Sequence, residues 1–327
     1  MTSAGERITV EAAPHWAGRL ITRALGGGGA TAITDGPASV RLRVEVASAP
    51  FRRAGLRPVT RGAFSDGECT LLLDVGGSGF DLMVTVDDEV LSVTARYRPA
   101  GRTRAANRLL PGRFALLAGQ VLVHYPVLWR AGWRGRVPLH ASVVRTGYGT
   151  PLLAGPGGVG KSTVLLGLLG EGAVATADNL CAADEQHCFG LAEPLRTDAA
   201  ARDRAGAGTR RTSHGRVERS LPRRVPMLTP DRLVLLERGP RTEIGVAKPD
   251  DLGRALVAGT YAAGELRRYW AFAATLALAT GCGPAHPPVM EVAGEYCARL
   301  PCLQVRVGDR DTVTAEQLCG KHKGEEK

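Results

Sequence analysis

The chain of 327 residues is long enough for one large domain or two ordinary ones. Its content of 44% hydrophobic and 23% charged residues excludes a disordered chain, which would carry fewer apolar residues. The net charge of +10 suggests anionic partners, among them nucleotide phosphates, an acidic peptide or nucleic acid.

The first half of the chain has the pattern of a β-rich domain. The stretch SVRLRVEV (39–46) alternates apolar and charged residues with the period of a half-buried strand. Turn-like GGSG and DDE separate further predicted strands at 70–75, 80–86 and 90–98. With a helix at 12–25, residues 1–130 are expected to form a β-rich α+β domain built on an antiparallel meander. Its role could be substrate recognition, oligomerisation or purely structural, because it carries no catalytic motif.

The most apolar part of the chain runs from Leu109 to Trp129 and predicts one or two buried helical segments. It is too short to span a membrane, and Gln120, His124 and Pro126 interrupt it. The amino terminus has no apolar stretch long enough for a signal peptide. We therefore expect a cytoplasmic protein without a membrane partner. The seven cysteines show no C-x-x-C spacing, which favours reduced thiols over a zinc site.

From Val137 the pattern changes to strands that alternate with a helix, which indicates an α/β sheet over 131–327. The predicted strands are PLHASVV (138–144), TPLLAG (150–155), AVATADN (173–179) and DRLVLLERG (231–239). The stretch GKSTVLLGLLGEG supplies the helix.

Between strand and helix lies GPGGVGKS, which satisfies the phosphate-loop pattern G-x-x-x-x-G-K-[ST] completely. Glycines let the backbone turn tightly, so that several N–H groups and the positive end of the helix dipole face one anion. The lysine can reach the β- and γ-phosphates, and the serine can ligate Mg²⁺. The expected nucleotide-binding residues are Gly155, Gly157, Gly158, Val159, Gly160, Lys161, Ser162 and Thr163.

Phosphoryl transfer also needs a group that orients the attacking oxygen. Asp178, in ATADNL, follows the next predicted strand and should face the γ-phosphate as a general base, a metal ligand or both. A structural aspartate that caps a turn is the alternative. His140, on the strand before the loop, could hydrogen-bond Asp178, or it could have a core role.

The order LHASVV, GPGGVGKS and ADN resembles the HPr kinase/phosphorylase family and its kinase-like relatives, including those of lasso-peptide and other ribosomal peptide pathways. The resemblance covers 130–240 well and 240–320 loosely. It implies an α/β P-loop kinase domain that uses ATP and Mg²⁺. The catalytic residues would be Asp178 as the base, His140 as its partner, and Lys161. It places Ser162, Asp178 and Asn179 at the metal. The family has Asp-Asp where this chain has Asp178-Asn179, so one anionic contact with the metal is missing. Glu193 is the nearest acidic candidate for a second metal contact.

The segment 202–224 holds eight arginines against two acidic residues. Arg210, Arg211 and His214 could close over the phosphates and stabilise transition-state charge. The same segment could instead dock an acidic peptide or form a solvated loop, and the sequence leaves the three alternatives open.

The expected function is therefore ATP- and Mg²⁺-dependent phosphorylation of a serine or other hydroxyl of a peptide or protein, with an acidic ribosomal precursor peptide as one candidate acceptor. Because the relatives are often oligomeric, the resemblance also implies a homo-oligomer. No nucleic-acid partner is expected, because no aromatic stacking motif or recognition helix accompanies the basic charge. Two alternatives stay open: a nucleotide-binding regulatory protein that has lost transfer, for which Asn179 argues, and a small-molecule phosphotransferase.

Overall fold

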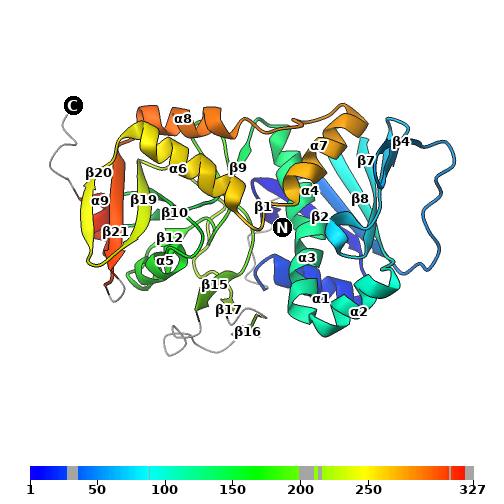
Figure 1. Cartoon of the computed structure of the whole chain (residues 1–327), viewed down its shortest axis with the longest axis horizontal. Helices are drawn as coiled ribbons and strands as arrows, with labels where there is room; N and C mark the ends of the chain where they lie inside the picture. The colour runs from blue at the N-terminus through cyan, green and yellow to red at the C-terminus, as the bar shows by residue number, and fades with distance from the viewer. Residues whose placement is uncertain (28–35, 88, 199–209, 213–215, 309–310, 321–327) are drawn as a thin grey trace. The chain divides into compact units, whose positions relative to one another are not determined.

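The computed structural model describes residues 1–27, 36–87, 89–198, 210–212, 216–308 and 311–320, and shows a mixed α/β protein with several sheets (Figure 1). Contacts divide the chain into two compact units. Unit 1 comprises Met1–Gly135, Asp198–Arg219 and Arg268–Pro287, and unit 2 comprises Arg136–Thr197, Ser220–Arg267 and Pro288–Lys327. The expected domains, 1–130 and 131–327, are contiguous, whereas 198–219 and 268–287 belong to unit 1 by their contacts.

Unit 1 is built on an eight-stranded sheet with the order β1-β2-β3-β8-β7-β6-β5-β4. Its strands are β1 (Thr2–Ser3), β2 (Glu6–Ala12), β3 (Val40–Glu45), β4 (Arg57–Thr60), β5 (Ala63–Ser65), β6 (Cys69–Leu72), β7 (Phe80–Asp87) and β8 (Val90–Tyr97). The expected antiparallel meander is present from β4 to β8. The expectation is wrong for β3, which pairs parallel with both β2 and β8. The helix α1 (His15–Ala24) lies between β2 and β3 in the sequence and supplies the crossover that a parallel pair needs.

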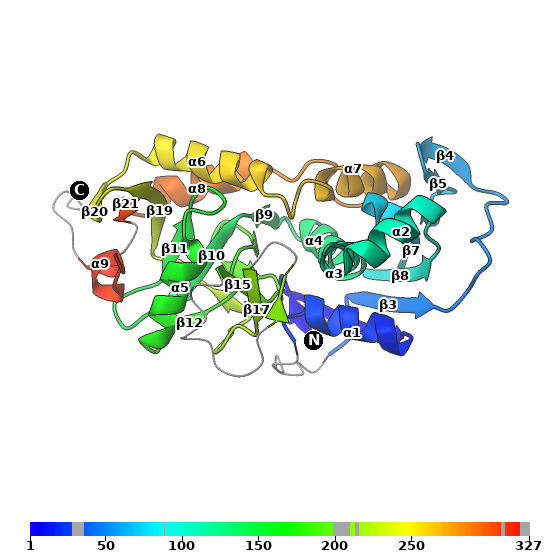
Figure 2. The same ribbon diagram turned by 60° about the horizontal axis from the view of Figure 1, so that its bottom comes forward.

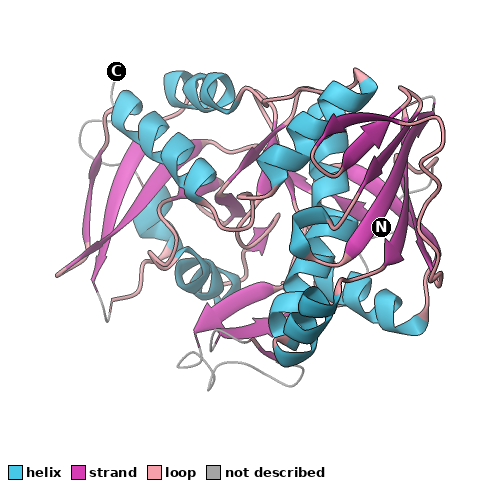
Figure 3. Ribbon diagram, turned by 45° about the vertical axis from the view of Figure 1, so that its right-hand side comes forward, coloured by secondary structure: helices cyan, strands magenta, loops and turns pink. Residues whose placement is uncertain are grey.

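Helices of unit 1 pack against this sheet (Figure 3). Along β3 the apolar Val40, Leu42 and Val44 are buried while Arg41 and Arg43 are exposed, as the alternation predicts. Four aromatic rings from two strands and two helices pack against one another around the buried Phe80: Trp16, Phe80, Tyr97 and Phe114. Burial of apolar side chains between the sheet and the helices therefore stabilises unit 1.

The predicted apolar helices form one helical run with a π-helical turn in its middle. The run comprises α3 (Pro111–Gly119), the π-turn η2 (Gln120–His124) and α4 (Tyr125–Gly132). The other elements of unit 1 are the short η1 (Val75–Gly77), α2 (Gly101–Leu109), α7 (Tyr269–Thr280) and the strands β16 (Arg210–Arg211) and β17 (Arg216–Arg219). Helix α7 packs on β4, β5 and β6. Among the described residues, no helix has the length and apolar character needed to cross a membrane.

Unit 2 contains a six-stranded sheet with the order β12-β10-β11-β19-β21-β20. Its strands are β10 (Ala141–Arg145), β11 (Pro151–Ala154), β12 (Val174–Ala175), β19 (Arg232–Gly239), β20 (Glu243–Val246) and β21 (Cys302–Gly308). Strands β11, β19 and β21 run parallel, and β10 runs antiparallel to β11. The predicted strands at 150–155 and 231–239 are confirmed.

A second, four-stranded sheet of unit 2 corrects two strand predictions. It comprises β9 (Val137–Leu139), β13 (Cys181–Ala183), β14 (Cys188–Gly190) and β18 (Met227–Leu228). The predicted strand 138–144 is broken at His140, where the chain leaves β9 and enters β10 of the larger sheet. Of the predicted strand 173–179 only β12 is extended, because the chain turns after Thr176.

The helices of unit 2 cover both faces of the larger sheet (Figures 1 and 2). One face carries α5 (Lys161–Gly170) and α9 (Ala315–Cys319), and the other carries α6 (Pro249–Ala262) and α8 (Val289–Arg299). Leu165 and Leu168 of α5 belong to one buried cluster with residues of β11, β19 and β21. The strand β15 (Leu195–Asp198) follows the site described below.

Candidate phosphate-binding site

The glycine-rich loop joins the carboxyl end of β11 to the first residue of α5. Gly155, Gly158 and Gly160 have φ values of 147°, 80° and 108°, which side chains rarely allow. A Cβ on Gly155 would lie 2.5 Å from the carbonyl oxygen of Leu236, so the loop needs glycine there. The free N–H groups at the start of a helix and its positive dipole end favour an anion at this point.

Lys161 is buried, and its ammonium group lies inside the loop. Nζ donates to the carbonyl oxygen of Gly155 at 2.8 Å and to that of Pro156 at 3.3 Å. The crest of the loop, 156–158, is exposed. The lysine is therefore within reach of an anion that binds the loop.

Strand register brings the other predicted residues to this end of the sheet. Because β10 is antiparallel to β11, with Ala141 opposite Ala154, the residue before β10 lies beside the loop. That residue is His140. The chain after β12 then runs along the start of β10, where the Ser142 hydroxyl donates to the backbone carbonyl of Asp178.

His140 contacts Asn179, which corrects the expectation that its partner is Asp178. Its Nε2 lies 2.8 Å from Asn179 Oδ1, so Nε2 carries the proton. Burial and the positive charge of Lys161 lower the pKa of His140, which favours the neutral ring. The backbone N–H of His140 donates to Thr260 Oγ1 of α6 at 3.0 Å. The imidazole thus positions the amide of Asn179 and leaves the Asp178 carboxyl to other partners.

Asp178 is buried, and its two carboxyl oxygens differ. Oδ2 accepts the backbone N–H of Arg196 at 2.9 Å. Oδ1 is buried and has no close hydrogen-bond partner within the described part of the chain, although the Ser162 hydroxyl lies near enough to interact with the carboxyl. Burial raises the pKa of Asp178, against the opposing effects of the Arg196 N–H, the Ser162 hydroxyl and Lys161. A carboxyl with a raised pKa and an unpartnered oxygen is suited to accept a proton.

Glu193, considered above as a second metal contact, instead binds backbone. Its Oε1 accepts the N–H groups of Asn179 at 3.1 Å and of Leu180 at 3.0 Å. Its Oε2 lies 3.7 Å from the Arg196 guanidinium, which is also 3.7 Å from Glu265 Oε1. Burial raises the pKa of Glu193 to about 8.

The structure adds residues that sequence reasoning missed. Arg238 lies near the end of β19, and its guanidinium would be 3.6 Å from a Cβ on Gly160. Only the parallel register of β19 with β11 could have indicated this, since the two segments are distant in sequence. Arg196, Thr260 and Glu265 were likewise missed, because their contacts join segments that are distant in sequence. Of the predicted arginine-rich contacts, His214 and the side chains of Arg210 and Arg211 lie outside the described residues.

The oxygen groups at the loop fit Mg²⁺. A hydroxyl (Ser162), a carboxylate (Asp178) and an amide oxygen (Asn179) are hard ligands, which Mg²⁺ prefers. Mg²⁺ in nucleotide sites is usually held by one or two carboxylates together with substrate phosphates. The described residues contain no cluster of three or more His, Cys, Asp or Glu side chains that could hold a metal alone. A metal here would therefore be shared with the phosphates.

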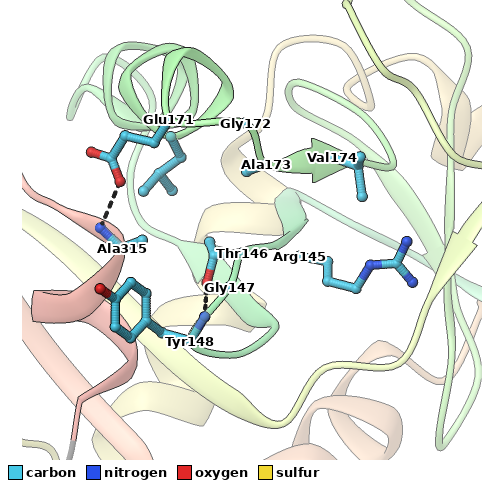
Figure 4. Close-up of a pocket in the computed structure, with 10 residues that line it drawn as sticks. Arg145, Thr146, Gly147, Tyr148, Glu171, Gly172, Ala173, Val174 and Ala315 are labelled. Carbon is cyan, nitrogen blue, oxygen red and sulfur yellow. Dashed lines mark hydrogen bonds between the residues drawn. The ribbon is translucent and has the colours of Figure 1, made fainter.

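A cavity of about 470 Å³ lies at the opposite end of α5 from the phosphate loop (Figure 4). It is lined by the end of β10, the turn at 146–148 and the residues after α5. Glu171 reaches across to accept the Ala315 N–H at 3.3 Å. This cavity contains no residue of the loop and is separate from the site described above.

No protein-family model matches the chain, and no curated protein matches it either. A functional assignment therefore depends on the chemistry of the site.

Proposed function

We propose that this chain is an ATP- and Mg²⁺-dependent kinase, with an HPr kinase-like P-loop fold in its second unit, that phosphorylates a serine or other hydroxyl of a peptide or protein. The observation that carries the proposal is the position of Asp178. Its carboxyl is buried with one oxygen unpartnered, at the same end of the sheet as the phosphate loop. The Ser162 hydroxyl and Lys161 are near enough to influence its pKa.

Each residue of the site has a defined role in this reaction. The loop N–H groups hold the ATP phosphates, and Lys161 exchanges its contacts with Gly155 and Pro156 for the β- and γ-phosphates. Ser162, Asp178 and Asn179 would hold Mg²⁺, which neutralises charge on the phosphates. Asp178 Oδ1 takes the proton of the acceptor hydroxyl while the oxygen of that hydroxyl bonds to the γ-phosphorus. The bond between the γ-phosphorus and the oxygen that leaves with ADP breaks in the same step.

The test is transfer of γ-labelled phosphate from ATP to acidic peptides that contain serine. We expect the wild type to label the peptide. Asp178→Asn should lose about 10² to 10⁴ in kcat, the usual contribution of a general base. Lys161→Ala should weaken ATP binding as well. Asp250→Asn, an exposed aspartate in the first turn of α6, is the matched control and should behave as wild type.

Two outcomes would overturn these assignments. A wild type that binds ATP and labels no peptide or protein is not this kinase. If Asp178→Asn transfers label as fast as the wild type, Asp178 is not the base. Label found in a small molecule would support phosphoryl transfer and would show that the acceptor is a small molecule instead of a peptide or protein.

One observation favours a second candidate, a nucleotide-binding regulatory protein without transfer. Asn179 brings no charge to the metal, and its Oδ1 already accepts the hydrogen bond from His140. Tight binding of Mg²⁺-ATP without label transfer is the result that this candidate predicts. Asn179→Asp should then create transfer activity by restoring the missing charge.

A further inference from the structure

The segment from Glu193 to Arg196 contacts the turn at 178–180 at three points. The Glu193 carboxyl accepts the N–H groups of Asn179 and Leu180. The Arg196 backbone N–H donates to Asp178 Oδ2 at 2.9 Å. Four consecutive residues therefore hold both the backbone of the turn and the side chain of the proposed base.

The local sequence favours a fixed geometry in this segment. Pro194 follows Glu193 and restricts the backbone there to φ near −65°. Glu193 is 3% exposed, and a carboxyl is rarely buried so deeply without partners. Its second oxygen faces Arg196, which also faces Glu265 at 3.7 Å. The two N–H contacts and the neighbouring Arg196 guanidinium are the polar partners of this buried group.

We propose that Glu193 is a positioning residue of the transfer reaction, which orients Asp178 and Asn179 by accepting the two N–H groups that follow them, and that it is not a metal ligand. This inference rests on the proposed function. Holding a catalytic group in the reactive geometry contributes strongly to rate, and a displacement of about 1 Å can cost about 10²-fold.

The proposal assigns Glu193 a role as hydrogen-bond acceptor that needs no negative charge, and two substitutions test it. Glu193→Gln keeps an oxygen at the acceptor position and cannot ionise. Glu193→Ala removes both. We expect Glu193→Gln to retain kcat within about threefold and Glu193→Ala to lose about tenfold or more, with little change in the KM for ATP. Glu185→Ala, an exposed glutamate in the turn between β13 and β14, is the control.

The Mg²⁺ dependence of the rate tests the statement that Glu193 is not a metal ligand. The Mg²⁺ concentration for half-maximal rate should be the same in wild type and Glu193→Gln. If Glu193→Gln raises that concentration about tenfold, Glu193 is a metal ligand and the proposal is wrong. Unchanged kcat in Glu193→Ala would also overturn it. Should Glu193→Ala fail to fold, Glu193→Asp, which is one methylene shorter, replaces it and should lower kcat without affecting the Mg²⁺ requirement.

Amide hydrogen exchange distinguishes failure of this inference from failure of the proposed function. Exchange at Asn179 and Leu180 should be faster in Glu193→Ala than in wild type, and close to wild type in Glu193→Gln. Equal exchange in all three proteins shows that Glu193 does not hold the turn, whatever the activity. A third outcome is faster exchange in Glu193→Ala together with a wild type that transfers no phosphate. That outcome overturns the proposed function and the positioning role of Glu193 in it. It still shows that Glu193 holds the turn.

Discussion

At the scale of single residues, burial governs the ionisable groups around the phosphate loop. It raises the pKa of Asp178 and Glu193 and lowers the pKa of His140. It also lowers the pKa of Arg224 to about 10, although the guanidinium donates to the backbone carbonyls of Thr176 and Gly190. Each shift disfavours the charged form of its group.

The raised pKa of Glu193 predicts a pH-dependent effect of Glu193→Gln on stability. An unfolded glutamate ionises near 4.5, whereas the native group keeps its proton to about pH 8. Between these values the unfolded chain binds fewer protons, so this group lowers the free energy of unfolding as the pH rises, by at most about 1.4 kcal/mol per pH unit. Glutamine does not ionise. The variant should therefore gain stability relative to wild type from pH 5 to pH 8.

Urea unfolding of both proteins across this pH range measures the effect. Glu185→Gln, which changes an exposed group, should follow the wild type at every pH. A constant difference between Glu193→Gln and wild type would contradict the raised pKa.

Local motifs were predictable at this scale, and contacts across turns were not. The loop residues Gly155–Ser162 were identified because their conformational demands are encoded in adjacent positions. Asp178 was found because it follows a strand. The partner of His140 was mistaken, because a shift of one residue along the turn exchanges Asp178 for Asn179 and no sequence pattern fixes that turn.

At the scale of elements, α6 approaches the phosphate loop through a glycine. A Cβ on Gly259 would lie 3.6 Å from the Gly155 carbonyl oxygen and 3.9 Å from His140 Nδ1. These are ordinary contacts, so a methyl group fits at this position. The helix therefore forms part of the wall around the loop.

Substitution at Gly259 should separate stability from nucleotide binding. Gly259→Ala should raise the free energy of unfolding by about 0.5–1 kcal/mol, since alanine is the better helix former, and leave ATP affinity unchanged. Gly259→Leu should displace the Gly155 carbonyl or His140 and weaken ATP binding about tenfold. Calorimetric titration with ATP checks both. Ala258→Leu, at an exposed position of the same helix, is the control. An equal loss of ATP affinity in this variant would show that the effect comes from changing the helix and not from crowding of the loop.

Strands with clear alternation were predictable, and strands that change sheets were not. The positions of β3, β7, β8, β11 and β19 follow from their apolar patterns. The break at His140 was missed because both β9 and β10 are buried on all sides, which leaves a continuous apolar run without a boundary. The parallel pairing of β3 with β2 depends on the crossover through α1. That crossover is a property of the tertiary fold and is not encoded in the pattern of the strand itself.

At the scale of the whole molecule, neither unit is a continuous stretch of chain. Helix α7 lies far along the sequence from the strands that it covers in unit 1. The Ser65 hydroxyl donates to the carbonyl oxygen of Ala279 at 3.0 Å, which ties this helix to β5. A boundary near 130 was predictable from the change of pattern, whereas the return of 268–287 to unit 1 was not, because it depends on long-range packing.

A fragment of residues 1–135 should therefore fail to form a complete unit 1. Without α7 it exposes buried residues of β5 and β6, so we expect it to bind a hydrophobic dye and to unfold without a cooperative transition. Joining 268–287 to the fragment through a Gly/Ser linker should restore cooperative melting, as circular dichroism would show. The same linker with residues 249–262, the α6 helix of unit 2, is the control. Cooperative melting of 1–135 alone would contradict this prediction.

The discontinuity of unit 1 also has a consequence for synthesis in the cell. As the chain leaves the ribosome, the eight-stranded sheet is complete by residue 97, but α7 ends only at residue 280. During that interval, while all of the phosphate-loop strand and helix are being made, the faces of β5 and β6 that α7 covers stay open to other chains. The nascent protein is therefore open to aggregation from the completion of the sheet until α7 emerges, and a chaperone that shields this sheet would act during that interval.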